Sequence, residues 1–201
     1  GQVCISPSKF YIQENKKNDF VNLFVEKTKK LKMGNGMDDG IQLGPMTTKK
    51  RLNEIEELVD KTKQEGAKVL LGGKRPSEFN KGFYYEPTIF DGVNDNFTIM
   101  KQEPFGPLCP MLSFKTFDEV IKRANNHELG LASYICTNSM EKANRASEQI
   151  ETGTVAVNTP LVAQAEAPFG GIKQTGYGRE GGSMAIKDYL NIKYTHLGIK
   201  G

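Results

Sequence analysis

The residue type best suited to covalent chemistry stands near the start of the chain, in the opening Gly-Gln-Val-Cys that ends at Cys4. Free cysteines are commonly small buried apolar residues, so Cys4 becomes a candidate nucleophile only through the residues that accompany it. A thiolate attacks a carbonyl carbon, and hydrogen-bond donors must then hold the oxyanion that forms. No histidine stands near Cys4 in sequence. A Cys–His pair, and with it the alternative of an α/β cysteine hydrolase, would need the distant His127 or His196.

A second candidate group is the carboxylate of Glu103, within Gln-Glu-Pro-Phe-Gly-Pro at residues 102–107. Two prolines fix their own φ angles, and the glycine between them allows another surface to come close. A carboxylate held this way can accept both hydroxyls of a ribose, and the ring of Phe105 can pack on a nicotinamide. Taken alone, the segment also fits a turn with an exposed acid and a core phenylalanine.

The run Gly-Tyr-Gly-Arg-Glu-Gly at residues 176–181 formally matches the dinucleotide-binding pattern G-x-G-x-x-G. A functional fingerprint follows a strand, opens a helix and is followed by an acidic residue about 20 positions later. Residues 168–174 do not read as a strand, and too little chain follows for a second βα unit. We therefore predict a structural loop here.

A further loop, residues 158–169, is predicted to follow a strand that ends near Asn158. Loops after parallel strands commonly build active sites in open α/β sheets. Apolar residues here could line a substrate tunnel, and the alternative is a surface loop with a few apolar contacts. These residues are Leu161, Val162, Ala163 and Phe169.

Composition limits the class of protein. The chain has 201 residues, 37% of them hydrophobic and 25% charged, with a net charge of +3, which is ordinary for one globular α/β domain. The basic residues are spread among acids, which argues against nucleic-acid binding. No apolar run approaches the ~20 residues of a membrane span. Three cysteines without a C-x-x-C spacing suit a reducing cytoplasm, and two histidines are too few for a metal site.

Hydrophobic periodicity predicts strands that alternate with amphipathic helices, and hence an α/β fold with a mainly parallel sheet covered by helices. The predicted strands are 9–13, 67–71, 84–90 (at an edge or bulge, because of Pro87), 107–114, 131–137 (buried), 154–157 and 191–196. The predicted helices are 16–32, a helix capped by Thr47 or Thr48 that ends near residue 65, helices capped by Thr116 and Ser139, and 183–190.

Three stretches together, residues 1–4, 102–107 and 167–173 (Ala-Pro-Phe-Gly-Gly-Ile-Lys), resemble the catalytic C-terminal half of the NAD(P)-dependent aldehyde dehydrogenases. The resemblance implies Cys4 as nucleophile, with its own backbone N–H as one oxyanion donor. It implies Glu103 and Phe105 as contacts of the nicotinamide ribose and ring, with NAD or NADP as cofactor. The activating glutamate and the side-chain oxyanion donor of the family lie upstream of its nucleophile, so this chain alone is expected to be inactive.

Within the family, residues 167–176, 178–181 and 189–194 look most like succinate-semialdehyde dehydrogenases. Those enzymes usually have a serine in the preceding loop that helps to hold the substrate carboxylate. Here Ala163 occupies that place and Gln164 beside it could substitute; with Phe169 they are the expected substrate contacts. Ser6 stands where some members have a second cysteine, so no redox disulfide with Cys4 is expected.

The resemblance also implies a division of the chain. Residues 1–182 are expected to form the catalytic domain, and residues 183–201 a C-terminal helix and oligomerisation strand. The segment 191–197 matches the family's arm that adds to a neighbouring subunit's sheet, so a homo-oligomer, a dimer or tetramer, is expected for the intact cytoplasmic enzyme. The alternatives are a catalytically silent folded fragment and another aldehyde dehydrogenase subfamily.

Overall fold

The fold was analysed in a computed structural model, which describes residues 1–199 and 201. The chain divides into two compact units, residues 1–126 and residues 127–201, and each is described by itself. The first unit holds the four-stranded sheet, and the second holds two shorter strand pairs.

The sheet of the first unit is mainly parallel. Its strands are β1 (Phe10–Gln13), β2 (Lys68–Leu71), β3 (Thr88–Asp91) and β4 (Leu108–Phe114), in the order β1-β4-β3-β2. Strand β4 pairs in parallel with both β1 and β3, in a register that aligns Phe10 with Met111 and Thr88 with Leu108. Only β2 runs antiparallel, against β3, with an irregularity between Val69 and Leu71. The predicted fold class is therefore confirmed.

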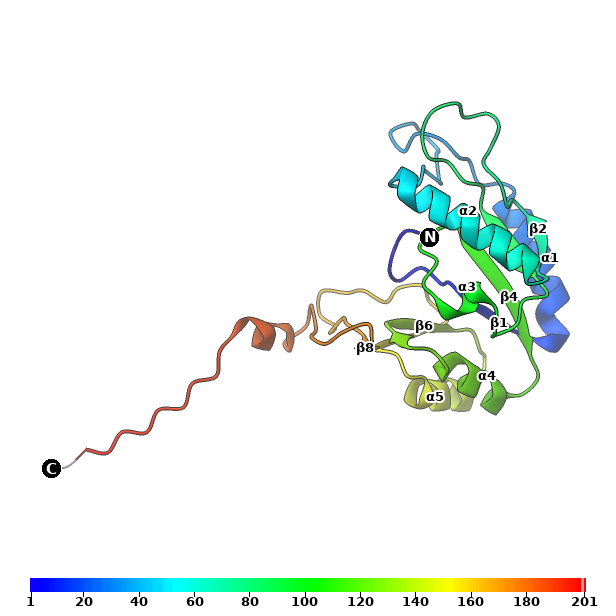
Figure 1. The fold of residues 1–201 in the computed structure, drawn as a ribbon. Coiled ribbons are helices and arrows are strands. Elements are labelled where there is room, and N and C mark those ends of the chain that lie inside the picture. The colour runs from blue at the N-terminus through cyan, green and yellow to red at the C-terminus, as the bar shows by residue number, and fades with distance from the viewer. Residues whose placement is uncertain (200) are drawn as a thin grey trace. The chain divides into compact units, whose positions relative to one another are not determined.

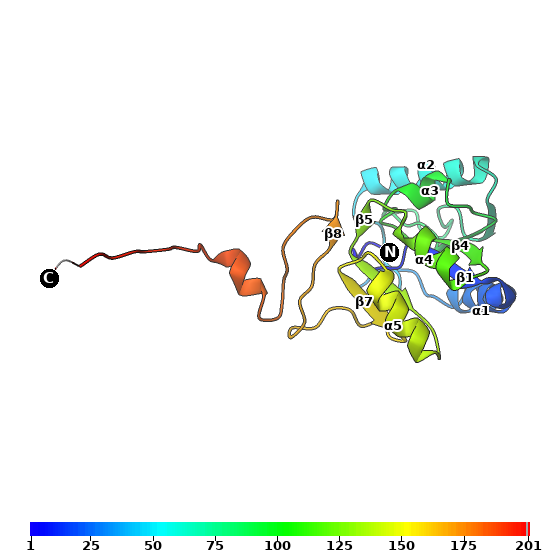
Figure 2. The same cartoon turned by 90° about the horizontal axis from the view of Figure 1, so that it is seen from below.

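Helices cover both faces of this sheet (Figure 1). The long helix α2 (Lys49–Gln64) and the short α3 (Thr98–Lys101) lie on one face, and α1 (Lys17–Thr28) lies on the other, as Figure 2 shows from below. Successive side chains of a strand point to opposite faces, so each strand packs against the helices on both faces of the sheet. The larger cluster joins α2 and α3 to Phe90, Leu108 and Leu112, whereas the smaller cluster joins Val21 of α1 to Ile89 and Met111.

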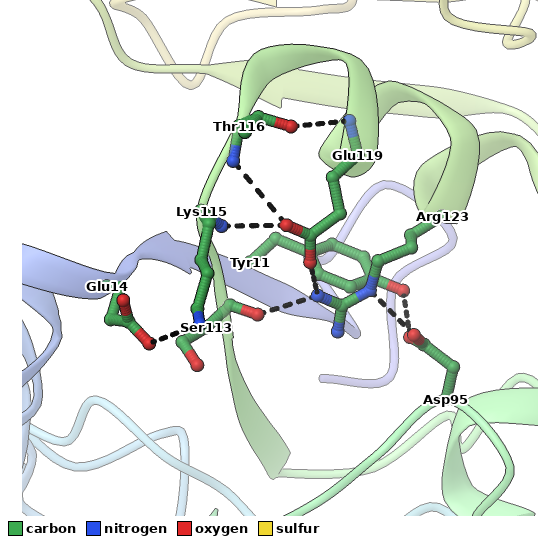
Figure 3. A network of polar contacts seen from close by, with 8 residues as sticks. All are labelled: Tyr11, Glu14, Asp95, Ser113, Lys115, Thr116, Glu119 and Arg123. Carbon is green, nitrogen blue, oxygen red and sulfur yellow. Dashed lines mark hydrogen bonds and ion pairs between the residues drawn. The ribbon is translucent and has the colours of Figure 1, made fainter.

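Helix α4 (Phe117–Asn125) follows β4 and begins with a complete capping box. Thr116 accepts a hydrogen bond from the Glu119 N–H, and the Glu119 side chain bonds back to the Thr116 backbone. Figure 3 shows how α4 is then tied to the sheet: Arg123 donates to Asp95, to the Ser113 carbonyl and to Glu119. This network fixes the position of α4 against β4 and the 92–97 loop.

The second unit contains β5 (Leu129–Gly130), β6 (Ala132–Ile135), α5 (Met140–Gln149), β7 (Thr154–Val157), β8 (Ile172–Lys173) and the 3-10 helix η2 (Ala185–Tyr189). Strands β6 and β7 pair in parallel, and β5 pairs antiparallel with β8. The Ser139 side chain caps α5, as predicted. Its buried face consists of small residues, Ala143 and Ala146.

Two sequence predictions in the first unit need correction. The strand predicted at 84–90 starts only at Thr88 and is internal, because Pro87 precedes the ladder and removes none of its hydrogen bonds. The helix predicted at 16–32 begins with the 3-10 turn η1 (Glu14–Lys16), and α1 ends at Thr28. Beyond Thr28 the backbone bonds shift to the tighter i→i+3 spacing, as in Leu31 N–H to the Thr28 carbonyl.

Two predictions in the second unit also need correction. Strand β6 is half-buried rather than buried. Among residues 190–199 no strand forms, and Ile192 and Tyr194 are exposed. A strand needs a second backbone to pair with, and the described chain offers none to this segment. The division at residue 182 and the role of the C-terminal segment stay predictions.

Candidate active site

A small cavity of about 30 Å³ in the first unit brings together residues that are far apart in sequence. One side is the loop that carries Cys4, and the other is the turn that contains Glu103 and Phe105. Both segments precede strands that are parallel neighbours, β1 and β4, so both lie at the amino-terminal edge of the sheet. The lining residues are Gly1, Val3, Cys4, Ser6, Pro7, Ser8, Glu103, Pro104, Phe105 and Gly106.

The nucleophile candidate sits in a tight turn. The Ser6 N–H donates to the Val3 carbonyl at 2.9 Å, which places Cys4 in the middle of the turn with its side chain exposed. Gly1 passes so close to Gly106 that a Cβ atom on Gly1 would overlap the Gly106 carbonyl. The absence of a side chain at this position therefore lets the Cys4 loop approach the opposite wall of the cavity.

The opposite wall is built by residues 103–106, between α3 and β4. Helix α3 is anchored by Ile99 and Met100, which are buried, and by Glu65, which accepts hydrogen bonds from the backbone and hydroxyl of Thr98. Phe105 has a φ of 45°, an uncommon conformation for a residue with a side chain. Phe105 lies between Pro104 and Gly106, and a strained residue beside a cavity is a frequent feature of functional sites.

The Glu103 carboxylate on this wall is open to solvent. The Glu103 side chain is exposed, and within the described residues it has no hydrogen-bond or ion-pair partner. Its oxygens are thus free to accept the hydroxyls of a ribose, and the half-buried ring of Phe105 lines the same cavity. The role of Glu103 and Phe105 as contacts of the nicotinamide ribose and ring stays a prediction.

The expected substrate residues belong to the second unit. Ala163 and Gln164 are exposed in the loop after β7, and Phe169 is half-buried. Phe169 exchanges two backbone hydrogen bonds of 2.7 Å with Glu180, which closes the 165–182 segment on itself. Their approach to Cys4 stays a prediction.

The loop 158–169, which follows β7, starts at Asn158. Asn158 has a φ of 55°, and its side-chain amide bonds both the N–H and the carbonyl of Thr137. The carboxyl ends of β6 and β7 are thus tied together where the loop 158–169 begins. The sequence pattern identified Asn158 as the end of a strand, but neither its φ nor its amide contacts.

The glycine run at 176–181 is a loop, as predicted, and no α-helix follows it among the described residues. The prediction that no strand precedes it needs correction, because the short strand β8 ends at Lys173. Arg179 donates to the Gly171 carbonyl at 2.9 Å, so the run folds back on the preceding turn. Within residues 1–199 and 201, no group of three or more His, Cys, Asp or Glu side chains is arranged to hold a metal ion. Nor is any described helix long and apolar enough to cross a membrane.

Sequence reasoning missed several residues that build the site. Helix α3 has only four residues, too few for a periodic pattern to reveal it. The contacts of Gln2 with residues 45–47 join segments more than 40 positions apart and leave no local signal.

The fold and the cavity together define a class of protein. A model described as "Aldehyde dehydrogenase family" matches residues 1–195. The chain belongs to the aldehyde dehydrogenase family.

Several curated relatives resemble the chain at similar levels. It is 41% identical over 193 residues to "Aldehyde dehydrogenase, cytosolic 1" of Rattus norvegicus, covering 96% of this chain and 38% of the relative. It is 40% identical over 198 residues to the mitochondrial succinate-semialdehyde dehydrogenase of Arabidopsis thaliana, covering 98% of this chain and 37% of the relative. The chain therefore spans about two fifths of the length of these relatives.

Solved structures agree with the family and the fold. The succinate-semialdehyde dehydrogenase of Burkholderia pseudomallei superposes with a TM-score of 0.93 at 35% identity, over 97% of this chain and 40% of that one. An NADP-dependent enzyme of E. coli gives a TM-score of 0.94 at 37% identity, over 99% of this chain and 41% of that one. The betaine aldehyde dehydrogenase of Staphylococcus aureus, solved in complex with NAD+, gives a TM-score of 0.92 at 35% identity, over 94% of this chain and 38% of that one.

Proposed function

We propose that the chain is the nucleophile-bearing part of an enzyme that oxidises an aldehyde, with succinate semialdehyde the preferred substrate, to its carboxylic acid with NAD or NADP. The observation that carries the proposal is the shared cavity of Cys4, Glu103 and Phe105. A thiol, a free carboxylate and a ring in one cavity match what thiol addition and nicotinamide binding require.

The chemistry begins at Cys4. Its thiolate adds to the aldehyde carbon and forms a C–S bond, while the carbonyl oxygen becomes an oxyanion that the Cys4 N–H can stabilise. NAD(P), when bound, is the hydride acceptor. Loss of hydride converts the thiohemiacetal into a thioester, which water hydrolyses to release the acid and the thiolate. Glu103 would hold the ribose and Phe105 the nicotinamide ring, and the bound cofactor would supply the hydride acceptor.

A semialdehyde is the proposed substrate, because semialdehyde dehydrogenases are among the relatives. The relatives at about 40% identity include two kinds of semialdehyde dehydrogenase as well as cytosolic aldehyde dehydrogenases. The proposal assigns the carboxylate end of the substrate to Gln164, beside Ala163, with Phe169 against the chain of the substrate. Oxidation of another aldehyde by the same steps is the alternative.

The C-terminal segment is proposed to act in assembly. Residues 190–199 expose alternating apolar side chains and have no strand partner within the described chain. Such a segment can add to the sheet of another copy, so a dimer or tetramer is proposed for the intact protein. A cytoplasmic location is proposed because no disulfide links the three cysteines, which are all free.

Two assays on this chain test the proposal. The first measures the absorbance of NADH or NADPH formed from succinate semialdehyde, glutarate semialdehyde or a simple aliphatic aldehyde, with Cys4→Ala as control. The second needs no cofactor: the aldehyde should slow alkylation of Cys4 and leave that of the exposed Cys136 unchanged. Turnover that Cys4→Ala abolishes supports the full proposal. Protection without turnover supports Cys4 as nucleophile in a chain that is silent by itself. The absence of both turnover and protection would refute the proposed role of Cys4.

A further inference from the structure

Gln2, two residues before Cys4, makes three contacts with a distant segment. Its side-chain oxygen accepts hydrogen bonds from the backbone N–H of Thr47 at 2.9 Å and from the Thr47 hydroxyl at 3.0 Å. Its side-chain nitrogen donates to the Pro45 carbonyl at 3.4 Å. Both ends of the carboxamide are therefore engaged, which requires a side chain that both donates and accepts.

The segment that Gln2 contacts is itself firmly held. The Met46 N–H donates to the Phe83 carbonyl at 2.8 Å, and the Met46 side chain is buried in the larger core cluster. Thr48 caps α2, whose Leu52 and Ile55 are almost completely buried. Residues 45–48 thus form a rigid support on the body of the first unit.

The loop of residues 1–6, which carries Cys4, contains a turn closed by the bond from the Ser6 N–H to the Val3 carbonyl, and Cys4 is exposed. Gly1 rests against Gly106, on the wall opposite. The Gln2 side chain adds three directional contacts between this loop and residues 45–47, whereas close packing at Gly1 limits approach but does not fix orientation.

We infer that Gln2 is a positioning residue: its carboxamide ties the Cys4 loop to the start of α2 and so keeps the thiol facing Glu103 and Phe105. The inference rests on the proposed role of Cys4 as nucleophile. It assigns no contact of Gln2 with substrate or cofactor. Gln2 acts on the reaction only through the orientation of Cys4.

Four variants separate the anchoring bonds from side-chain size. Gln2→Met keeps the length of the side chain and removes all three hydrogen bonds. Gln2→Glu keeps an acceptor for both Thr47 donors and loses only the 3.4 Å bond to Pro45. Thr47→Val removes the hydroxyl donor but keeps the backbone N–H. Arg51→Met, which removes a neighbouring surface ion pair without touching Gln2, is the matched control.

The readout is the rate of Cys4 alkylation by a bulky maleimide, measured from pH 6 to pH 9, with Cys136 as the reference thiol in the same molecule. The 103–106 wall shields one side of Cys4, so release of the loop should expose the thiol more often. Loss of one hydrogen bond should raise the rate about fivefold in Thr47→Val, which corresponds to about 1 kcal/mol. Gln2→Met should raise it about tenfold or more, and Gln2→Glu should return it to within about twofold of the unmodified chain.

The outcomes decide between anchoring and a general effect on folding. A rise for Gln2→Met with rescue by Gln2→Glu, an unchanged Cys136 rate and no effect of Arg51→Met supports the inference. Unchanged Cys4 rates in Gln2→Met, or a Gln2→Glu rate equal to that of Gln2→Met, would overturn it. Because maleimide needs neither aldehyde nor cofactor, a chain that fails the aldehyde-protection assay still gives a result here, so the two proposals can fail separately.

Discussion

Removal of the Arg123 guanidinium should destabilise the first unit far more than removal of an ordinary surface arginine. Arg123 donates to Asp95 at 2.6 Å, to the Ser113 carbonyl at 2.6 Å and to Glu119 at 2.8 Å. Its guanidinium carbon also lies 4.9 Å from the centre of the Tyr11 ring, whose hydroxyl donates to the second Asp95 oxygen at 2.7 Å. Figure 3 shows all of these groups converging on the one side chain.

The size of the expected loss in the free energy of unfolding follows from the partial burial of Arg123 and Asp95. The Arg123 side chain is 22% exposed and that of Asp95 is 35% exposed, so the network is neither a surface pair nor a fully buried one. Exposed ion pairs contribute about 0–1 kcal/mol, and breaking a buried pair costs about 3–5 kcal/mol. For Arg123→Met we therefore expect a loss of about 2 kcal/mol in the free energy of unfolding, since the carbonyl of Ser113 also loses its donor. Tyr11→Phe should cost about 1 kcal/mol.

Urea unfolding followed by circular dichroism measures both losses, with the urea dependence checked to be unchanged. Arg51→Met is the matched control, because Arg51 makes one i,i+3 ion pair with Glu54 at 3.0 Å and should cost less than about 0.5 kcal/mol. In the double variant Arg123→Met/Tyr11→Phe, the two losses should not add, since both residues share Asp95. A cost for Arg123→Met equal to that of Arg51→Met would refute the reasoning.

Three further predictions concern other parts of the chain. Burial raises the pKa of the Cys109 thiol to about 11, so between about pH 9 and pH 11 the folded state keeps a proton that the unfolded chain loses. The Cys109 thiol should lower the free energy of unfolding by about 2–3 kcal/mol as pH rises through this window, so the change between pH 8 and pH 11 in urea unfolding should differ by that amount between Cys109→Ala and the unmodified chain. Asn158→Ala should be less stable than Asn158→Gly by about 1 kcal/mol in thermal and urea unfolding. Both variants lose the hydrogen bonds to Thr137, but only alanine is strained at a φ of 55°. Equal stabilities would show that backbone strain at residue 158 is unimportant. The free energy of unfolding of Phe105→Gly should lie within about 1 kcal/mol of that of the unmodified chain, whereas Phe105→Val should lose about 2 kcal/mol or more. The reason is that relief of the backbone strain at φ 45° offsets the loss of the ring only in glycine. The reverse order of stabilities would contradict this account.

Much of the fold could be predicted because its elements carry local signals. Helix α2 has a polar cap at Thr48 and a buried stripe of Leu52, Ile55, Leu58 and Val59 at helical spacing. Strand β4 and helix α4 are bounded by Thr116, a strong capping residue. In each case the residues that set the element lie within a few positions of one another, so tertiary context had little to add.

The parts that could not be predicted depend on distant contacts. The sequence around Pro87 indicates an edge or a bulge, and only the tertiary arrangement shows that β3 is internal and starts just after the proline. The segment 191–196 has a strand-like composition, yet a strand forms only where a second backbone is present. For the site, the family resemblance predicted Cys4 and Glu103, whereas the Gln2 contacts depend on how the chain returns at residues 45–47.

The candidate site lies at the amino-terminal edge of its sheet, and this position departs from the rule that ligands bind at the carboxyl ends of parallel strands. Cys4 precedes β1 and Glu103 precedes β4, and these neighbours are parallel, so their pairing brings together two segments about 100 residues apart. The rule instead indicates Asn158, which follows the carboxyl end of β7 in the other unit. A site built on the entry loops of two strands cannot depend on strand ends for rigidity, because those loops run before the ladder begins. In this chain the rigidity comes from a turn with proline on both sides, from the close packing of Gly1 on Gly106 and from the Gln2 carboxamide. The geometry at Cys4 should therefore be more sensitive to changes in these three features than to changes in the sheet itself.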